Sequence, residues 1–175
     1  MPWDFAWRIT TAVFSYTNHT LLPEALEKWS VPLMEGLLPR HMQIIYLVNG
    51  LHLDAQRSAG RQDNGFLSSI SLIEENHSRR VRMGHLAFLG SRRVNGVSAL
   101  HTELMRKTVF GSLNAIYPER IVNKTNGITF RRWLFQANPA LTDLITEAIG
   151  PAFLDDPARI ADLAPFADDP AFRGR

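Results

Sequence analysis

Three short segments place asparagine amides beside turn residues and just before apolar helical patterns. Their sequences are SYTNHT at residues 15–20, VNGV at residues 94–97 and NKTNGIT at residues 123–129. An asparagine side chain both donates and accepts hydrogen bonds, so it can pair with the neighbouring hydroxyls of a sugar or with nearby backbone. Amides in this arrangement can recognise polyols, and the three segments therefore point to a carbohydrate ligand.

Each segment also has an ordinary structural interpretation, because asparagine and glycine are common in turns and helix caps. His19 can equally be a hydrogen-bonded loop residue or part of a site. The paired glutamates at positions 24/27 and 74/75 fall at expected helix starts, where acids favour the helix dipole, so glycosidase chemistry is not supported. Without cysteine or a histidine pair at helical metal-binding spacing, a zinc site is not expected.

The elements that would position these segments are mainly helices joined by short connections. A proline followed by an apolar run predicts the longest helix, over about residues 39–54. We interpret the apolar run at residues 82–89 as a short buried strand, although a helical turn would also fit. A turn over residues 90–96, a helix over about 97–109 and a short strand at 121–123 complete the middle of the chain.

Two of the polar segments lie in strand–turn–helix passages, which predict an α/β, helix-rich fold. Free backbone N–H groups at the helix starts would then meet a ligand at the ends of the strands. Residues 71–74 also have the spacing of a capping box, which predicts a helix start there.

The net charge of +2 conceals strong patterning along the chain. Residues 79–132 contain eleven basic and two acidic side chains, whereas the segments on either side of them are net acidic. Such a basic centre indicates a nearby anion, such as phosphate, nucleic acid or an acidic partner. A solvated face that the acidic flanks neutralise is the alternative.

Composition indicates an ordinary globular domain, or a piece of a larger protein. The chain has 175 residues, of which 45% are hydrophobic, and it contains no run of apolar residues long enough to span a membrane. The first residues lack the pattern of a secretory signal. The absence of cysteine excludes disulfides and is compatible with a cytoplasmic location.

Taken together, the motifs resemble the α-glucan phosphorylases, the family of glycogen, starch and maltodextrin phosphorylases. The resemblance rests on YTNHTLLPEALEKW at 16–29, LPRHMQIIY at 38–46, VNGV at 94–97, and NKTNGIT at 123–129 with RRW at 131–133. The order and spacing of these motifs match the family from about Asp4 to Phe172.

The resemblance implies a fragment of a glycosyltransferase B-type fold, in which two Rossmann-like domains enclose the active site. Residues 1–123 would be the end of the N-terminal domain, and residues 124–175 would be the start of the C-terminal domain. The remainder of the family chain is absent from this sequence.

Three residues carry family roles by resemblance. His19 matches the histidine that hydrogen-bonds the primary hydroxyl of glucose at the cleavage site, and Asn123 matches an asparagine that helps to hold the same hydroxyl. Val94 matches a valine that lines the sugar pocket. The sequence departs from the family pattern at Arg92, where relatives often have histidine, and at Gly50, which makes a glycogen storage site doubtful. Phe130, where many have proline, is a mild departure.

The resemblance further implies phosphorolysis of an α-1,4-glucan or oligosaccharide by inorganic phosphate to give glucose 1-phosphate, in a cytoplasmic enzyme that is usually a homodimer. The family cofactor is pyridoxal phosphate, and the lysine that attaches it has no counterpart among Lys28, Lys107 and Lys124. We therefore expect the 175 residues alone to be inactive, and we expect neither nucleic acid nor a membrane as a partner.

Two other interpretations remain open from the sequence. The chain could be a catalytically inactive, stand-alone helical module for binding or interaction, with its basic centre directed at nucleic acid or a protein. The tryptophans lie mostly outside that basic segment, which disfavours a nucleic-acid reader. It could also be a non-functional fragment whose exposed surface aggregates.

Overall fold

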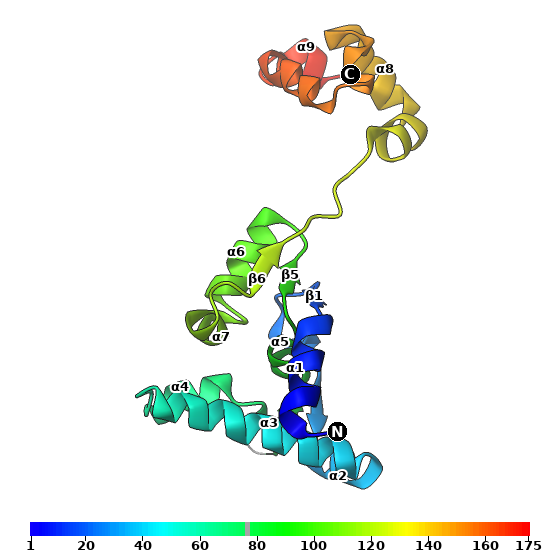
Figure 1. Cartoon of the computed structure of the whole chain (residues 1–175). Helices are drawn as coiled ribbons and strands as arrows, with labels where there is room; N and C mark the ends of the chain where they lie inside the picture. The colour runs from blue at the N-terminus through cyan, green and yellow to red at the C-terminus, as the bar shows by residue number, and fades with distance from the viewer. Residues whose placement is uncertain (76–77) are drawn as a thin grey trace. The chain divides into compact units, whose positions relative to one another are not determined.

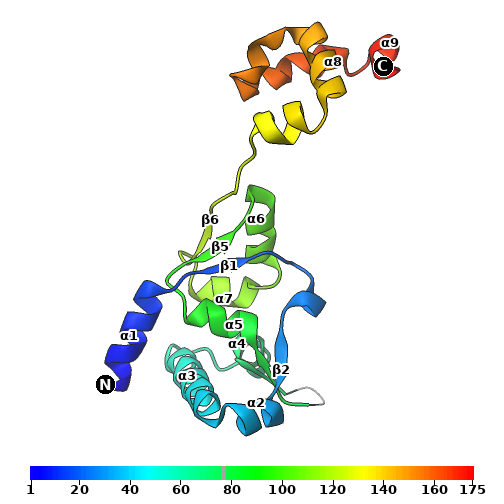
Figure 2. The same cartoon turned by 90° about the vertical axis from the view of Figure 1, so that its right-hand side faces the viewer.

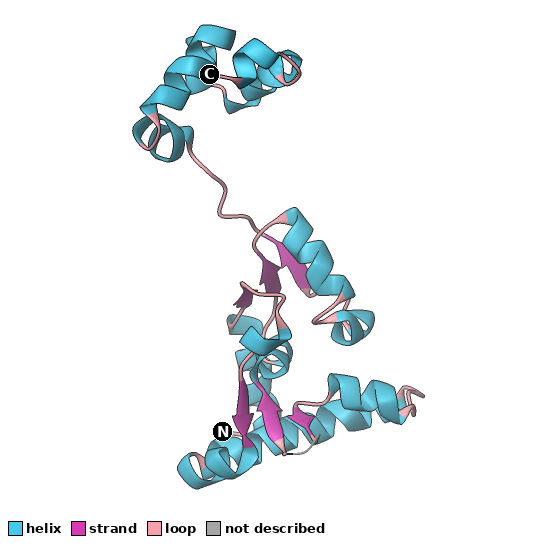
Figure 3. Cartoon of the chain, turned by 180° about the vertical axis from the view of Figure 1, so that it is seen from behind, coloured by secondary structure: helices cyan, strands magenta, loops and turns pink. Residues whose placement is uncertain are grey.

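The computed structural model describes residues 1–75 and 78–175. It divides into two compact units, Met1–Asn126 and Gly127–Arg175, which are coloured along the chain in Figure 1. Every described strand lies in the first unit, and helices and loops make up the rest (Figure 3). The fold is therefore mixed α/β and rich in helix, as the sequence predicts.

The first unit contains a three-stranded parallel sheet, which we call sheet A. Its strands are β1 (Tyr16–Asn18), β5 (Val94–Gly96) and β6 (Ile121–Asn123), in the spatial order β1-β5-β6. Figure 2 shows the three strands side by side with α6 (Ala99–Lys107) next to them. The strand predicted at 121–123 is confirmed as β6.

A second, antiparallel sheet, sheet B, has β4 (Arg80–Arg82) between β2 (Lys28–Ser30) and β3 (Ile73–Glu74). Glu74 is almost buried at its edge, and its carboxylate lies 2.8 Å from both Lys28 Nζ and Arg80 Nη2 and 3.8 Å from Arg82 Nη2. The hydrogen bond from Lys28 holds the pKa of Glu74 below its usual value. Sheet B is thus held by a carboxylate shared among three cations.

The longest helix, α3 (Pro39–Ser58), begins at the predicted proline and continues four residues beyond the predicted end at 54. One of its faces is buried, and the residues on it include Met42, Ile45 and Val48. Besides α6, the described part of the unit contains the helices α1 (Trp3–Val13), the short 3-10 helix η1 (Pro23–Ala25), α2 (Val31–Leu37), α4 (Asn64–Ile70), α5 (Met83–Leu89) and α7 (Gly111–Ile116).

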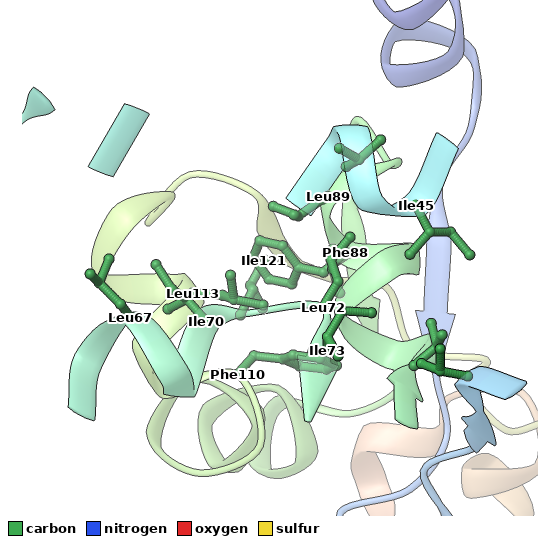
Figure 4. Packing of buried hydrophobic residues seen from close by; sticks show 14 of the residues in the cluster. Ile45, Leu67, Ile70, Leu72, Ile73, Phe88, Leu89, Phe110, Leu113 and Ile121 are labelled. Atoms are coloured by element: carbon green, nitrogen blue, oxygen red, sulfur yellow. The ribbon is translucent and has the colours of Figure 1, made fainter. Parts of the chain in front are cut away.

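The core of the first unit joins α3, α4, α5 and α7 to sheets A and B. Figure 4 shows Phe88, Leu72, Phe110 and Ile121 packed together, and each of these side chains is at most 2% exposed. Phe88 and Phe110 meet with ring centroids 5.4 Å apart. Burial of this apolar surface is the main stabilising term available to so small a unit.

Three local predictions are wrong. Residues 83–89 form the helix α5 rather than a strand; they contain methionine, leucine and alanine and no β-branched residue, which favours a helix. The predicted turn at 90–96 contains the strand β5, which is too short to show a periodic pattern. The capping-box spacing at 71–74 does not start a helix, because Ile73 and Glu74 belong to β3.

The regular elements of the second unit are all helices. Asn138 caps α8 (Pro139–Ile149) by accepting a hydrogen bond from the backbone of Leu141, as its position before a proline predicts. Ile145 and Phe153 are its buried hydrophobic residues among those described. The other elements are the π-helical segment η2 (Arg131–Gln136), the 3-10 helices η3 (Pro151–Leu154) and η4 (Pro157–Phe166), and α9 (Pro170–Arg173).

An open apolar cavity of about 550 Å³ lies on the second unit. Trp133 lines it and is 71% exposed, and Ile128 at its edge is 81% exposed. The unit therefore leaves a large apolar surface in contact with solvent.

Candidate functional site at the carboxyl edge of sheet A

The three asparagine-bearing segments meet at one edge of sheet A. The strands are parallel, and their register aligns Asn18 with Gly96 and Gly96 with Asn123, so these residues form one row at the carboxyl ends of the strands. Neighbouring strands are about 4.8 Å apart, which places β1 and β6 about 10 Å from each other across β5. Ligands of open α/β sheets bind at this edge.

His19 follows the last residue of β1 directly and is exposed. The residue before it, Asn18, is 1% exposed. Asn18 Nδ2 donates to Tyr16 Oη at 3.0 Å, and Asn18 Oδ1 accepts from the backbone N–H of Thr20 at 3.1 Å. The turn that carries His19 is thus fixed on both sides of the histidine while its imidazole faces solvent.

Asn123 ends β6 and is also exposed. Its Nδ2 donates to the backbone oxygen of Gly96 at 3.1 Å and to Thr102 Oγ1 at 2.8 Å. A carbonyl oxygen only accepts, so the amide nitrogen must face Gly96, and the oxygen Oδ1 points elsewhere. No residue within 1–75 or 78–175 donates to that oxygen, which leaves it available as an acceptor.

Val94 occupies a different environment from the other two predicted residues. Its side chain is 0% exposed and belongs to the hydrophobic core, and its strand pairs with β1 at Tyr16 and with β6 at Ile121. In this structure Val94 therefore anchors the middle strand of sheet A and does not reach the surface at the edge.

Two residues at this edge were missed by the sequence analysis. His101 Nε2 lies 3.1 Å from both the backbone oxygen and Oδ1 of Asn18, and Thr102 holds Asn123 as described above. Both residues are in the first turns of α6, which Ser98 caps by accepting from the backbone of His101. A serine cap soon after the VNGV motif was the available signal that a helix begins beside the strand ends.

A family model described as carbohydrate phosphorylase matches residues 1–175, the whole of the chain. The chain belongs to the carbohydrate phosphorylase family. The glycogen phosphorylase of Chlamydia pneumoniae is 43% identical over 173 residues, which are 99% of this chain and 21% of that protein. The liver form from Bos taurus and the brain form from Rattus norvegicus are 46% and 47% identical over 172 residues, which are 98% of this chain and 20% of each relative.

The chain thus spans about a fifth of the length of the curated phosphorylases that it matches. Across residues 1–75 and 78–175, no helix combines the length and the apolar character that crossing a membrane requires. Within the same residues, no group of three or more histidine, cysteine, aspartate or glutamate side chains could hold a metal ion.

More than half of the basic side chains of residues 79–132 have structural partners. Arg82 and Arg120 donate to backbone oxygens, Arg106 donates to the backbone oxygen of Ile121, and Arg120 also lies 4.2 Å from the centre of the Tyr117 ring. Carboxylates pair with Arg79, Arg80 and Lys107. These side chains thus have a structural role in the first unit, whereas Arg92, Lys124 and Arg131 of the same segment are exposed.

We expect none of the three lysines to attach pyridoxal phosphate, the cofactor that the resemblance implies. A Schiff base needs an uncharged, accessible amine. Lys28 Nζ lies 2.8 Å from Glu74 Oε1, and Lys107 Nζ lies 3.0 Å from Glu103 Oε1, so each of these two amines already contacts a carboxylate. Lys124 lies in the exposed connection after β6.

Two histidines, the buried His52 and the partly buried His85, lie away from the sheet edge. His52 lines a cavity of about 260 Å³ beside Tyr117, whose Oη is 3.4 Å from His52 Nδ1. Burial, with a smaller effect of the Arg120 charge, lowers the pKa of His52 to about 4. Burial likewise lowers the pKa of His85 to about 4, although its hydrogen bond to the Ser69 oxygen acts in the opposite direction. Both imidazoles are neutral near pH 7.

Proposed function

We propose that this chain is part of an α-1,4-glucan phosphorylase and supplies part of its glucose-binding site. The intact enzyme would use inorganic phosphate to release glucose 1-phosphate from glycogen or maltodextrin. The observation that supports the proposal most directly is the alignment of the His19 and Asn123 segments at one ligand-binding edge, in a chain that matches the phosphorylase family over its whole length.

In this proposal His19 and Asn123 orient the terminal glucose through its primary hydroxyl. The exposed imidazole of His19 approaches the sugar from the end of β1, and Asn123 Oδ1 accepts a hydrogen bond from the end of β6. Val94 keeps β5 in place beneath them. Orientation of this kind can lower a barrier by several kcal/mol, of the order of 7–11 kcal/mol in well-oriented intramolecular reactions.

The rest of the reaction needs groups that this chain does not provide. Pyridoxal phosphate, when bound to a family enzyme, would supply a phosphate group that exchanges a proton with the substrate phosphate. Since none of the three lysines here suits its attachment, we assign the cofactor site to another part of the family-length chain.

We further propose that residues 1–123 end the N-terminal domain and residues 124–175 begin the C-terminal domain of a glycosyltransferase B-type enzyme. The complete protein would be a cytoplasmic homodimer. A nucleic-acid-binding module is less well supported, because the tryptophans lie mostly outside the basic segment.

A chimera tests the proposal. The 175 residues replace the matching 172-residue segment of the bovine liver glycogen phosphorylase, and the release of glucose 1-phosphate is measured from maltoheptaose and phosphate. We expect His19→Ala to lower kcat/KM by about a hundredfold, the effect typical of lost substrate positioning. The matched control is His41→Ala, since His41 is exposed on α3.

The proposal fails if His19→Ala leaves kcat/KM of an active chimera unchanged, or if His41→Ala lowers kcat/KM as much as His19→Ala does. If the chimera does not fold, weak binding of maltoheptaose is measured on the 175-residue chain itself by ligand-observed NMR, with the same two variants. Equal binding by the parent and His19→Ala would then contradict the assignment.

A further inference from the structure

The first turns of α6 contact both segments of the proposed glucose site. His101 and Thr102 are neighbours in the chain, and one reaches toward β1 while the other reaches toward β6. Between these strands lies β5, whose Gly96 approaches Thr102 so closely that a Cβ atom at Gly96 would be 2.8 Å from Thr102 Cα. The helix is therefore in direct contact with the row of strand ends.

His101 holds the turn that carries His19. Its Nε2 is 3.1 Å from the backbone oxygen of Asn18 and 3.1 Å from Asn18 Oδ1. Both oxygens can only accept, so Nε2 must bear the hydrogen and donate to them. Asn18 Oδ1 also accepts from the backbone N–H of Thr20. The His101 imidazole therefore contacts the residue before His19 directly, and it is linked to the residue after His19 through Asn18 Oδ1.

Thr102 determines which end of the Asn123 amide faces outward. The Thr102 hydroxyl donates to the backbone oxygen of Ser98 at 2.7 Å, so its oxygen is free to accept from Asn123 Nδ2 at 2.8 Å. The second amide hydrogen is directed to the Gly96 oxygen. With both hydrogens engaged, Asn123 can offer a ligand only the acceptor Oδ1, which suits a donor such as a sugar hydroxyl.

We propose that His101 and Thr102 are positioning residues for the glucose site: His101 sets the place of His19, and Thr102 fixes Asn123 as a hydrogen-bond acceptor. The inference rests on the proposed function, because it assumes that His19 and Asn123 contact the sugar. It adds that α6 itself does not contact the substrate and instead determines the geometry of His19 and Asn123, which do.

Conservative pairs of variants separate positioning from general stability. In His101→Gln the amide nitrogen can occupy the place of Nε2 and donate, whereas the shorter His101→Asn cannot reach Asn18. Thr102→Ser keeps the hydroxyl, whereas Thr102→Val keeps the shape and removes it. Each pair therefore contains one variant that retains the hydrogen bond and one that loses it.

The hydrogen bonds are first measured on the 175-residue chain by NMR. We expect the His101 ring to show a hydrogen on Nε2, and we expect Thr102→Val to shift the side-chain amide signals of Asn123 while Thr102→Ser leaves them nearly unchanged. The proposal would be overturned, without any activity assay, if the His101 ring carried its hydrogen on Nδ1 alone. It would also be overturned if the Asn123 amide signals were unchanged in Thr102→Val.

The kinetic consequence is measured in the chimera. We expect His101→Asn and Thr102→Val each to lower kcat/KM for maltoheptaose by about tenfold per active site, the loss that accompanies about 1.4 kcal/mol, with an unchanged KM for phosphate. His101→Gln and Thr102→Ser should restore most of the activity. A defect of folding alone would reduce the amount of active enzyme and leave both KM values as they were.

The outcomes for the two proposals differ. If His19→Ala impairs the chimera but all four α6 variants keep full activity, the positioning role is wrong and the glucose site stands. If His19→Ala is harmless, the glucose site itself is wrong, and the positioning role falls with it. Both proposals would be supported if kcat/KM falls in His101→Asn and Thr102→Val, which lose the hydrogen bond, and is largely restored in His101→Gln and Thr102→Ser, which retain it.

Discussion

Replacement of Gly96 by alanine places a methyl group inside the contact between β5 and α6. A Cβ atom there would lie 2.2 Å from Thr102 Oγ1, 2.8 Å from Thr102 Cα and 2.9 Å from Thr102 Cβ. Carbon atoms pack at about 3.5–4.0 Å, so the contact needs to open by about 1 Å. Rotation of the hydroxyl alone cannot provide this space, because a backbone atom is among the three.

The expected cost follows from two contributions. Overpacking of a tight contact destabilises a protein by about 1–3 kcal/mol. Movement of Thr102 also weakens its hydrogen bonds to Asn123 and Ser98, and one such bond contributes about 1 kcal/mol. We therefore expect Gly96→Ala to lower the free energy of unfolding of the first unit by about 3 kcal/mol.

Gly50→Ala is the matched control, and we expect it to raise the free energy of unfolding rather than lower it. Gly50 lies within α3, and no heavy atom is within 4 Å of the Cβ position, so the alanine meets open space. Its higher helix propensity should raise the free energy of unfolding by about 0.5–1 kcal/mol. Addition of Thr102→Ala to Gly96→Ala should recover only part of the loss, since the contacts with Cα and Cβ remain.

Urea unfolding at pH 7 measures these differences, with tryptophan fluorescence as the signal. The chain has four tryptophans, and replacement of the exposed Trp133 by phenylalanine leaves only the three in the first unit. A Gly96→Ala midpoint within the error of the parent, or a change of the same sign at Gly50, would refute the argument from the close approach of β5 to α6.

Three further predictions concern pH, sheet B and activity. In the folded protein the pKa values of His52 and His85 are about 4, which is lower than in the unfolded chain. The free energy of unfolding should therefore be highest above about pH 6.5 and should fall by up to about 3 kcal/mol per histidine toward pH 4. Urea unfolding that gives the same free energy at pH 7 and pH 5 would contradict this prediction. Glu74→Gln should destabilise the first unit by about 2 kcal/mol, because it leaves partly buried cations without a carboxylate. In the same assay Glu103→Gln, in an exposed pair, should leave the stability nearly unchanged. The 175 residues alone, given pyridoxal phosphate, maltoheptaose and phosphate, should release no glucose 1-phosphate and show no aldimine absorbance, and either signal would show that the chain is a sufficient enzyme.

Strong local signals made the longer elements predictable. The proline at position 39 and the apolar run after it located α3, and the asparagine before Pro139 located the start of α8. Both depend on residues within one or two turns of each other, which a single sequence contains. The family could also be recognised from the sequence, because several motifs occur in the same order and spacing as in its members.

The short elements of the site depended on distant partners. β5 has only three residues, and its hydrogen bonds go to strands that are far away in the sequence. Likewise, the contact between His101 and Asn18 joins residues 83 positions apart, and nothing in the local pattern around His101 indicates it. The candidate residues His19 and Asn123 came from motif resemblance, whereas the hydrogen bonds that orient them required the structure.

The order of strands in sheet A has a consequence for how the chain is synthesised. Among the described residues, β1 pairs with β5 alone, and the partner of Tyr16 in that pair is Val94, which is 78 positions later in the chain. At a translation rate of about 5–20 residues per second, roughly 4 to 16 s separate the two strands at the ribosome. During this interval the edge of β1 has no partner in the sheet, and closure of so long a loop is slow compared with the folding of local helices. The crossover that assembles the candidate site from distant segments therefore leaves its first strand without a partner in sheet A until β5 has been synthesised.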